Sequence, residues 1–178
     1  MPNNHEAIHT NATVYPGSAL LGCTCDSFPR KENVVSEISV ALSLFVEHGR
    51  QQAAADFYAA AFGAQKVQDH TLDGQLIAVD LLLGSMPISV AGANPKRQAD
   101  PALGGPFHPQ SAGAVSAVLR LTVGDIDAVV SQALAAGATV RDAIQQDDTG
   151  SRSAALYDPF GHIWGLTERK ATASRLAA

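Results

Sequence analysis

The 178-residue chain is 46% hydrophobic and 16% charged, which provides enough apolar material for a globular fold with a sizeable core. Its formal net charge of −5 argues against a nucleic-acid-binding protein, because such proteins usually present a basic face. No apolar run approaches the roughly 18 residues that a membrane span needs. We therefore expect a cytoplasmic protein that has neither nucleic acid nor membrane as a partner.

The first 35 residues are polar and show little hydrophobic periodicity, without the charged-then-apolar pattern of a signal peptide. Cys23 and Cys25 are separated by a single residue, which is poor geometry for a disulfide, and two thiols alone do not complete a zinc site. We predict a flexible arm over residues 1–35, a folded domain over 36–169 and a tail over 170–178.

After the arm, the pattern predicts a strand at 40–46 and then a helix with one apolar face. The apolar residues of this helix follow the spacing i, i+3, i+4, i+7, i+8: Ala54, Phe57, Tyr58, Ala61 and Phe62. Gly63 stands where a left-handed residue commonly ends a helix. Three strands are predicted next, at 67–72, 75–83 and 86–90. Asp73-Gly74, between the first two, is a strong signal for a tight hairpin.

The same order of elements recurs further along the chain. A strand at 118–123 precedes a second amphipathic helix, which Asp125 can cap and Gly137 ends. Strands at 139–144, 151–156 and 162–166 complete this copy. The body is thus two strand-helix-three-strand units, at 36–92 and 115–169. The linker at 93–114 is rich in Pro, Gly and Ala, and its length favours a functional flap or a flexible spacer.

The most distinctive motif is Asp158-Pro159-Phe160-Gly161, a turn in which Asp bonds the backbone two residues on and Pro presets φ. An alternating strand follows it. Together with Phe57-Tyr58 and the start of the second helix at Asp125, this segment resembles the vicinal oxygen chelate superfamily of glyoxalases, bleomycin-resistance proteins and extradiol dioxygenases. The resemblance implies an α+β fold in which two βαβββ units form a curved, cup-shaped mixed sheet.

In enzymes of that superfamily, metal ligands come from the first and last strands of each unit. The matching positions here are Ala41, Ser89, Val118 and Gly165. None of them has the imidazole or carboxylate that a transition metal needs, and shifting the register by one residue gives only apolar side chains. We therefore predict no metal and no cofactor.

The resemblance places one face of the sheet under the helices and the other in a ligand cup. Because strand side chains alternate, the less apolar set should enter the cup. The candidate ligand-binding residues are Ser43, Phe45, Asp80, Arg120, Thr122 and Tyr157. Asp80 and Arg120 either pair with each other or contact a ligand, since an unpaired buried charge is costly. Arg120 suits a carboxylate, and Asp80 suits a cation or could act as a base if burial raised its pKa.

Three other side chains near the last hairpin are assigned structural roles. We expect His162 to be hydrogen-bonded and Trp164 to lie in the core. Arg152 should point away from the cup and contact Asp147, Asp148 or Asp158.

Three functions remain open. The first is a metal-independent protein that binds a small-molecule ligand in the cup, which the resemblance implies to be a homodimer of the bleomycin-resistance type. The second is a lyase, isomerase or glyoxalase-like enzyme that uses unconventional metal ligands such as His48 or His108, or acid-base chemistry by Asp80. The third is an interaction protein whose cup is filled by side chains.

Overall fold

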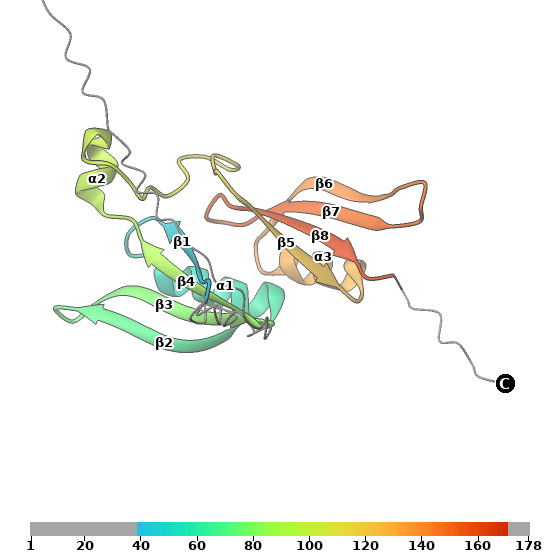
Figure 1. Cartoon of the computed structure of the whole chain (residues 1–178), viewed down its shortest axis with the longest axis horizontal. Helices are drawn as coiled ribbons and strands as arrows, with labels where there is room; N and C mark the ends of the chain where they lie inside the picture. Colours follow the sequence, from blue (N-terminus) through green and yellow to red (C-terminus); the bar gives the residue numbers. More distant parts are fainter. Residues whose placement is uncertain (1–38, 171–178) are drawn as a thin grey trace, which may run out of the picture. The chain divides into compact units, whose positions relative to one another are not determined.

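The computed structural model describes residues 39–170, which contain two consecutive βαβββ units (Figure 1). The predicted arm at 1–35 lies outside the described residues, together with Cys23 and Cys25, and so does nearly all of the predicted tail. The α+β class and the repeat of one supersecondary unit are confirmed.

The first unit forms a four-stranded mixed sheet in the order β1-β4-β3-β2. Its elements are β1 (Leu42–Val46), α1 (Gln51–Phe62), β2 (Gln65–Leu72), β3 (Gln75–Leu83) and β4 (Met86–Gly92). Strand β1 runs parallel to β4, and the other pairs are antiparallel. The predicted hairpin at Asp73-Gly74 is confirmed, because both residues have positive φ values, 51° and 76°, as a type I′ turn requires.

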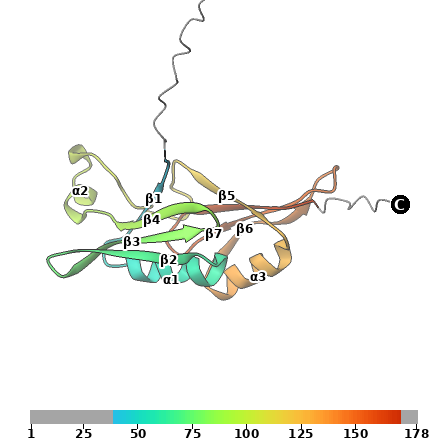
Figure 2. The ribbon, with the colours of Figure 1, turned by 60° about the horizontal axis from the view of Figure 1, so that its bottom comes forward.

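The second unit repeats this topology in the order β5-β8-β7-β6. Its elements are β5 (Val118–Val123), α3 (Ile126–Ala135), β6 (Thr139–Gln146), β7 (Arg152–Tyr157) and β8 (Ile163–Glu168). The predicted cap is confirmed, since the carboxylate of Asp125 accepts a hydrogen bond of 3.0 Å from the backbone N–H of Ala128. Helices α1 and α3 contact each other and lie on the same side of the strands (Figure 2).

Each unit contributes one four-stranded mixed sheet, which agrees with the fold of two βαβββ units that the resemblance implied. Among the described residues, β1 pairs only with β4 and β5 pairs only with β8, so each unit ends in an edge strand. The linker between the units also holds two short helices that the sequence pattern did not predict, α2 (Pro95–Ala99) and the 3₁₀ helix η1 (Pro101–Leu103). The side chain of Asn94 begins α2 by accepting a hydrogen bond from the N–H of Lys96.

Side-chain alternation places the core as predicted in most positions. The buried residues of β1, β3 and β8 that belong to the core cluster are Leu44, Val46, Val79, Leu81, Trp164 and Leu166. Ile163 of β8 is also buried, outside this cluster. Ile77 near the start of β3 and Leu134 near the end of α3 continue the apolar patterns of their elements, yet both are exposed. Both residues lie near the end of an element, where the opposite layer of the fold no longer covers their apolar side chains.

A buried carboxylate joins the two units. The hydroxyl of Tyr58 on α1 donates to Oδ2 of Asp158 at 2.7 Å, and the indole N–H of Trp164 donates to the same oxygen at 3.0 Å. The backbone N–H groups of Phe160 and His162 donate to Oδ1 at 2.9 Å, and Nδ1 of His162 lies 3.3 Å from Oδ2. Asp158 is only 5% exposed, so these donors replace the water that its charge has lost.

Burial acts to raise the pKa of Asp158, but the hydrogen bonds from His162, Trp164 and Tyr58 outweigh it and lower this pKa below its usual value. Burial, together with the charge of Asp158, raises the pKa of Tyr58 well above its usual value, so the phenol remains a proton donor. Aromatic rings surround the cluster, with the ring centroids of Tyr58 and Trp164 5.2 Å apart and those of Phe62 and Trp164 4.6 Å apart.

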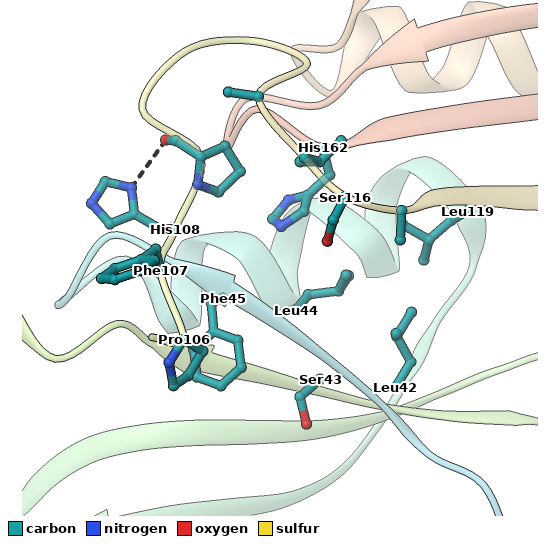
Figure 3. A pocket seen from close by; sticks show the side chains of 14 residues that line it. Leu42, Ser43, Leu44, Phe45, Pro106, Phe107, His108, Ser116, Leu119 and His162 are labelled. Atoms are coloured by element: carbon teal, nitrogen blue, oxygen red, sulfur yellow. Dashed lines mark hydrogen bonds between the residues drawn. The ribbon is translucent and has the colours of Figure 1, made fainter. Parts of the chain in front are cut away.

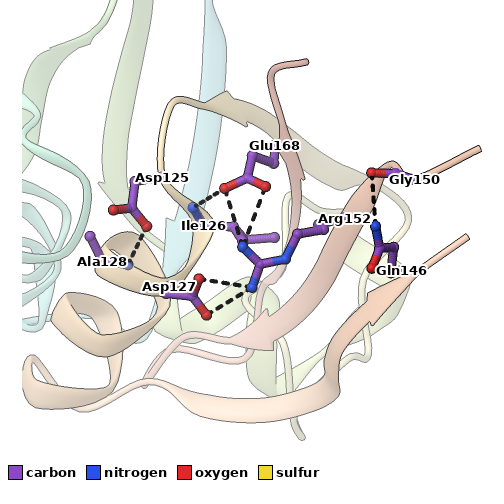
Figure 4. Close-up of polar contacts among 8 residues, drawn as sticks. All are labelled: Asp125, Ile126, Asp127, Ala128, Gln146, Gly150, Arg152 and Glu168. Atoms are coloured by element: carbon purple, nitrogen blue, oxygen red, sulfur yellow. Dashed lines mark hydrogen bonds and ion pairs between the residues drawn. The ribbon is translucent and has the colours of Figure 1, made fainter. Parts of the chain in front are cut away.

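The expectation for Arg152 was right about its face and wrong about its partners. Its guanidinium contacts Asp127 at 2.8 Å and Glu168 at 3.4 Å (Figure 4). It forms no ion pair with the three expected partners, Asp147, Asp148 and Asp158. Glu168 also accepts a hydrogen bond from the N–H of Ile126, the first residue of α3. Arg152 thus ties the start of α3 to β8, which sequence spacing could not show because Asp127 and Glu168 come from distant segments.

We predict that Asp158→Asn lowers the free energy of unfolding by about 2–4 kcal/mol at neutral pH, because two side-chain donors and two backbone donors lose a charged acceptor. Because the pKa of Asp158 is lower in the native state, its ionised carboxylate stabilises the fold at pH values above the pKa of an unfolded Asp, about 3.9. This stabilisation is lost as the pH falls through the native pKa. The difference between wild type and variant should therefore shrink below about pH 4. Urea unfolding at several pH values measures it.

The exposed carboxylate of Asp142 provides the matched control. Asp142→Asn should change the free energy of unfolding by no more than about 0.5 kcal/mol. Equal effects of the two substitutions would contradict the role assigned to the buried cluster.

Candidate functional site

Two adjoining cavities lie along the edge strands β1 and β5. The first, which we name the linker cavity, has a volume of about 490 Å³ and is walled by β1, by linker residues and by His162 (Figure 3). The second, the strand cavity, has a volume of about 590 Å³ and is walled by β5, by the end of β3 and by Trp164. Both volumes fall within the range typical of small-molecule sites. Leu42, Ala117 and Leu119 line both cavities, so we treat them as one groove.

The linker cavity is mainly apolar and has a few polar groups. Strand β1 contributes Ser43 and Phe45, because its outward-facing residues alternate with the buried Leu44. The linker contributes Phe107, which is 43% exposed, and Ser116 follows from the segment between the linker and β5. In Figure 3 these side chains lie around the same space as Leu42 and Leu119.

The strand cavity has one cationic group on an apolar background. Arg120 and Thr122 reach it from the exposed face of β5, while Leu121 and Trp164 reach it from the core side. No described residue forms an ion pair with Arg120, whereas Arg141 and Arg152 are both paired.

The structure brings four of the six predicted binding residues to the groove. Ser43 and Phe45 line the linker cavity, and Arg120 and Thr122 line the strand cavity. Asp80 and Tyr157 line neither. The Tyr157 ring instead lies against the linker, where a Cβ on Gly113 would come within 3.0 Å of Cε1 of the ring. Gly113 also has a φ of 82°, so a larger residue there would be both strained and crowded.

Asp80 forms its ion pair within its own sheet and not with Arg120. Its Oδ2 lies 2.7 Å from Nε2 of His70 on the neighbouring strand β2. The hydrogen bond from His70, assisted by one from Ser89, lowers the pKa of Asp80 below its usual value. This corrects the idea that burial would raise its pKa, because the side chain is well exposed and carries a partner.

The positions that hold metal ligands in related enzymes do not fit a metal here. Within residues 39–170, no group of three or more His, Cys, Asp or Glu side chains is arranged to hold an ion. His48 and His108 line a common hollow with Glu47, yet they form no such group. At Gly165, opposite Arg120 in the β5–β8 ladder, a Cβ would lie 3.7 Å from Cγ of Arg120. The arginine stem therefore lies beside the position where the superfamily resemblance implies a metal-binding carboxylate.

Sequence reasoning missed the contribution of His162 and of the linker to the groove. His162 is hydrogen-bonded as predicted, but its ring also lines the linker cavity. The unusual length of the linker was the available signal, since loops of this length are often functional. Nothing in the sequence showed which linker residues would face β1.

Comparison with known proteins assigns the family. Residues 43–167 match the model of the glyoxalase-like domain. The chain belongs to this family, within the vicinal oxygen chelate superfamily. An uncharacterized protein of Mycobacterium tuberculosis (strain ATCC 25618 / H37Rv) is 32% identical over 136 residues, which cover 76% of this chain and 78% of the relative. An uncharacterized Mycobacterium bovis protein is 35% identical over 115 residues, covering 64% and 73%.

Solved structures show the same fold at lower sequence identity. TioX from Micromonospora sp. ML1 has a TM-score of 0.53 and 21% identity, covering 73% of this chain and 98% of its own. A glyoxalase/bleomycin resistance protein/dioxygenase family enzyme from Burkholderia phytofirmans PsJN has a TM-score of 0.55 and 20% identity, covering 72% and 95%. The fosfomycin resistance protein FosX of Listeria monocytogenes, solved with Mn(II), has a TM-score of 0.51 and 16% identity, covering 75% and 90%.

Among the described residues, no helix has both the length and the apolar character to cross a membrane.

We predict that His70→Ala raises the pKa of Asp80 toward about 3.9, because the largest interaction that lowers it is removed. A carboxyl-carbon NMR titration follows Asp80 directly. Thr71→Ala, a substitution at the next residue of β2, should leave the pKa of Asp80 unchanged. A carboxyl that titrates identically in wild type and His70→Ala would show that the pair does not form in solution.

Proposed function

We propose that this protein binds a small organic molecule in the groove between β1 and β5, and that binding needs no metal. The observation that carries the proposal is the groove itself, two adjoining cavities of about 490 and 590 Å³ with apolar walls and few polar side chains. Such a composition suits a ligand that is mostly buried and is oriented by a few polar contacts. The polar contacts available are Ser43, Ser116, Arg120, Thr122 and His162.

The guanidinium of Arg120 in the strand cavity favours a ligand that carries an anionic group. Its stem lies beside Gly165, so this part of the groove has a guanidinium near the position where the superfamily resemblance implies a metal ligand. A guanidinium presents a planar set of donors that matches a carboxylate. The neighbouring apolar surface of the strand cavity would receive the body of the ligand.

The two other functions have less support. An acid-base enzyme would need a carboxylate with a raised pKa, and the pKa of Asp80 is lowered by its partners. A metal enzyme would need ligands that the described residues do not bring together. An interaction protein with a filled cup would leave no space between the units, whereas the groove is open.

We also propose that the protein is a homodimer. The edge strands β1 and β5 leave backbone groups without a strand partner among the described residues, and such edges favour pairing with another chain. Light scattering after gel filtration tests this, and a monomer at all concentrations would exclude the dimer.

Ligands found by thermal stabilisation should bind equally well with and without divalent metals, because the binding groups belong to the protein. The screen should cover aromatic acids, antibiotics and thiol adducts. Protein purified without chelator should contain transition metal well below one ion per chain. A tightly bound stoichiometric ion would overturn the metal-independent proposal.

Arg120→Ala should weaken the binding of an anionic hit by more than about tenfold, corresponding to about 1.4 kcal/mol, while the folded state remains intact. Arg141→Ala is the matched control, because Arg141 is exposed and pairs with Asp142 away from the groove. Isothermal titration calorimetry measures both variants. If affinity were the same in wild type and both variants, Arg120 would not belong to the site.

A further inference from the structure

The side chain of His162 has one ring nitrogen that the buried cluster does not use. His162 is only 5% exposed, and its Nδ1 lies 3.3 Å from Oδ2 of Asp158 and 3.5 Å from the hydroxyl oxygen of Tyr58. The carboxylate of Asp158 only accepts hydrogen bonds, and the Tyr58 hydroxyl donates its hydrogen to Asp158. This arrangement assigns the hydrogen of a neutral ring to Nδ1 and leaves a lone pair on Nε2.

Nε2 of His162 reaches the linker cavity. Among the described residues it has no hydrogen-bond partner, whereas every fully buried side-chain nitrogen or oxygen of that region has one. Nε2 must therefore contact open space, and His162 lines the linker cavity. Figure 3 shows its ring at the cavity wall, beside Ser116 and above Leu44. The result is a hydrogen-bond acceptor held rigidly at the edge of an apolar space.

We propose that the linker cavity binds a phenol, whose hydroxyl donates a hydrogen bond to Nε2 of His162 and whose ring lies against the apolar walls. This deepens the proposed function, on which it rests, by naming the chemical class of the ligand. Phe45 and Phe107 offer aromatic surface on the β1 side and the linker side. A volume of about 490 Å³ is ample for one substituted ring.

The charges around the cavity favour a neutral donor over an ion. A carboxylate has no hydrogen to donate to Nε2 and would approach the negative charge of Asp158 through the ring. A cation would find no acidic side chain among the residues that line the cavity. The other imidazole there, His108, has its Nδ1 3.0 Å from the carbonyl of Pro109 and its Nε2 3.4 Å from the amide of Gln110.

Asp158 acts as a positioning residue in this arrangement. It fixes the ring of His162 through Nδ1 and the backbone N–H, so the acceptor nitrogen points in one direction. A preorganised acceptor in an apolar site discriminates strongly against ligands that cannot donate, because its lone pair would then be buried without a partner.

Calorimetric titration at neutral pH with para-cresol and para-methylanisole tests the proposal, because both probes are uncharged there and differ only in the hydroxyl hydrogen and its methyl replacement. The wild-type protein should prefer the phenol by at least about tenfold. In His162→Phe this preference should disappear, and in His48→Phe, the same substitution at an exposed histidine outside the linker cavity, it should persist. The Nε2 resonance of His162 should shift on addition of the phenol and not of the ether.

Two further comparisons keep the test independent of folding. His162→Phe retains four of the donors to Asp158, and its near-ultraviolet circular dichroism should match that of the wild type. Ser116→Phe places a ring in the cavity without touching the cluster and should weaken both probes by about tenfold or more.

Equal binding of phenol and ether by the wild type, or a preference that survives in His162→Phe, would overturn the role of His162 while leaving a binding groove in place. Failure of both probes to bind would refute the phenol assignment. The proposed function would then depend on whether Arg120→Ala weakens the hits of the stabilisation screen.

Discussion

The rest of the structure depends on one buried carboxylate, Asp158. It lies in the turn between β7 and β8 and takes hydrogen bonds from Tyr58 on α1 and from Trp164 on β8. A charge removed from water in this way is stable only when each of its oxygens is satisfied, and here each oxygen has two donors. The same group therefore shapes its own turn and holds the two βαβββ units together.

This link also determines where the groove lies. The helices pack together on one side, while the sheets remain separate and each ends in an edge strand facing the groove. The groove has an apolar lining because β1 and β5 must bury one face in the core, and their alternate residues supply the few polar groups. His162 belongs to both regions, since one of its nitrogens contacts Asp158 and its ring lines the linker cavity.

The electrostatic character of the groove follows from two neighbouring residues, Gly165 and Arg120. Gly165 stands where the superfamily resemblance implies a metal-binding carboxylate, and the stem of Arg120 lies beside it, since a Cβ on Gly165 would be 3.7 Å from Cγ of Arg120. In the proposed function, the guanidinium of Arg120 would recognise an anionic group, and the oriented imidazole of His162 would recognise a hydrogen-bond donor. Asp80, which seemed a candidate for the same site, is instead satisfied by His70 within its own sheet.

The sequence by itself determined the repeated unit, most strand and helix positions, the turn at Asp158 and the lack of suitable side chains at the expected metal positions. These features are local, because they follow from the alternation of apolar residues, from helix caps and from glycine or proline at turns. Only the tertiary structure decided the partners of Asp80 and Arg152, the separation of the two sheets and the second role of His162. Each of these depends on side chains that are distant in the sequence, and periodicity carries no information about which distant segments meet.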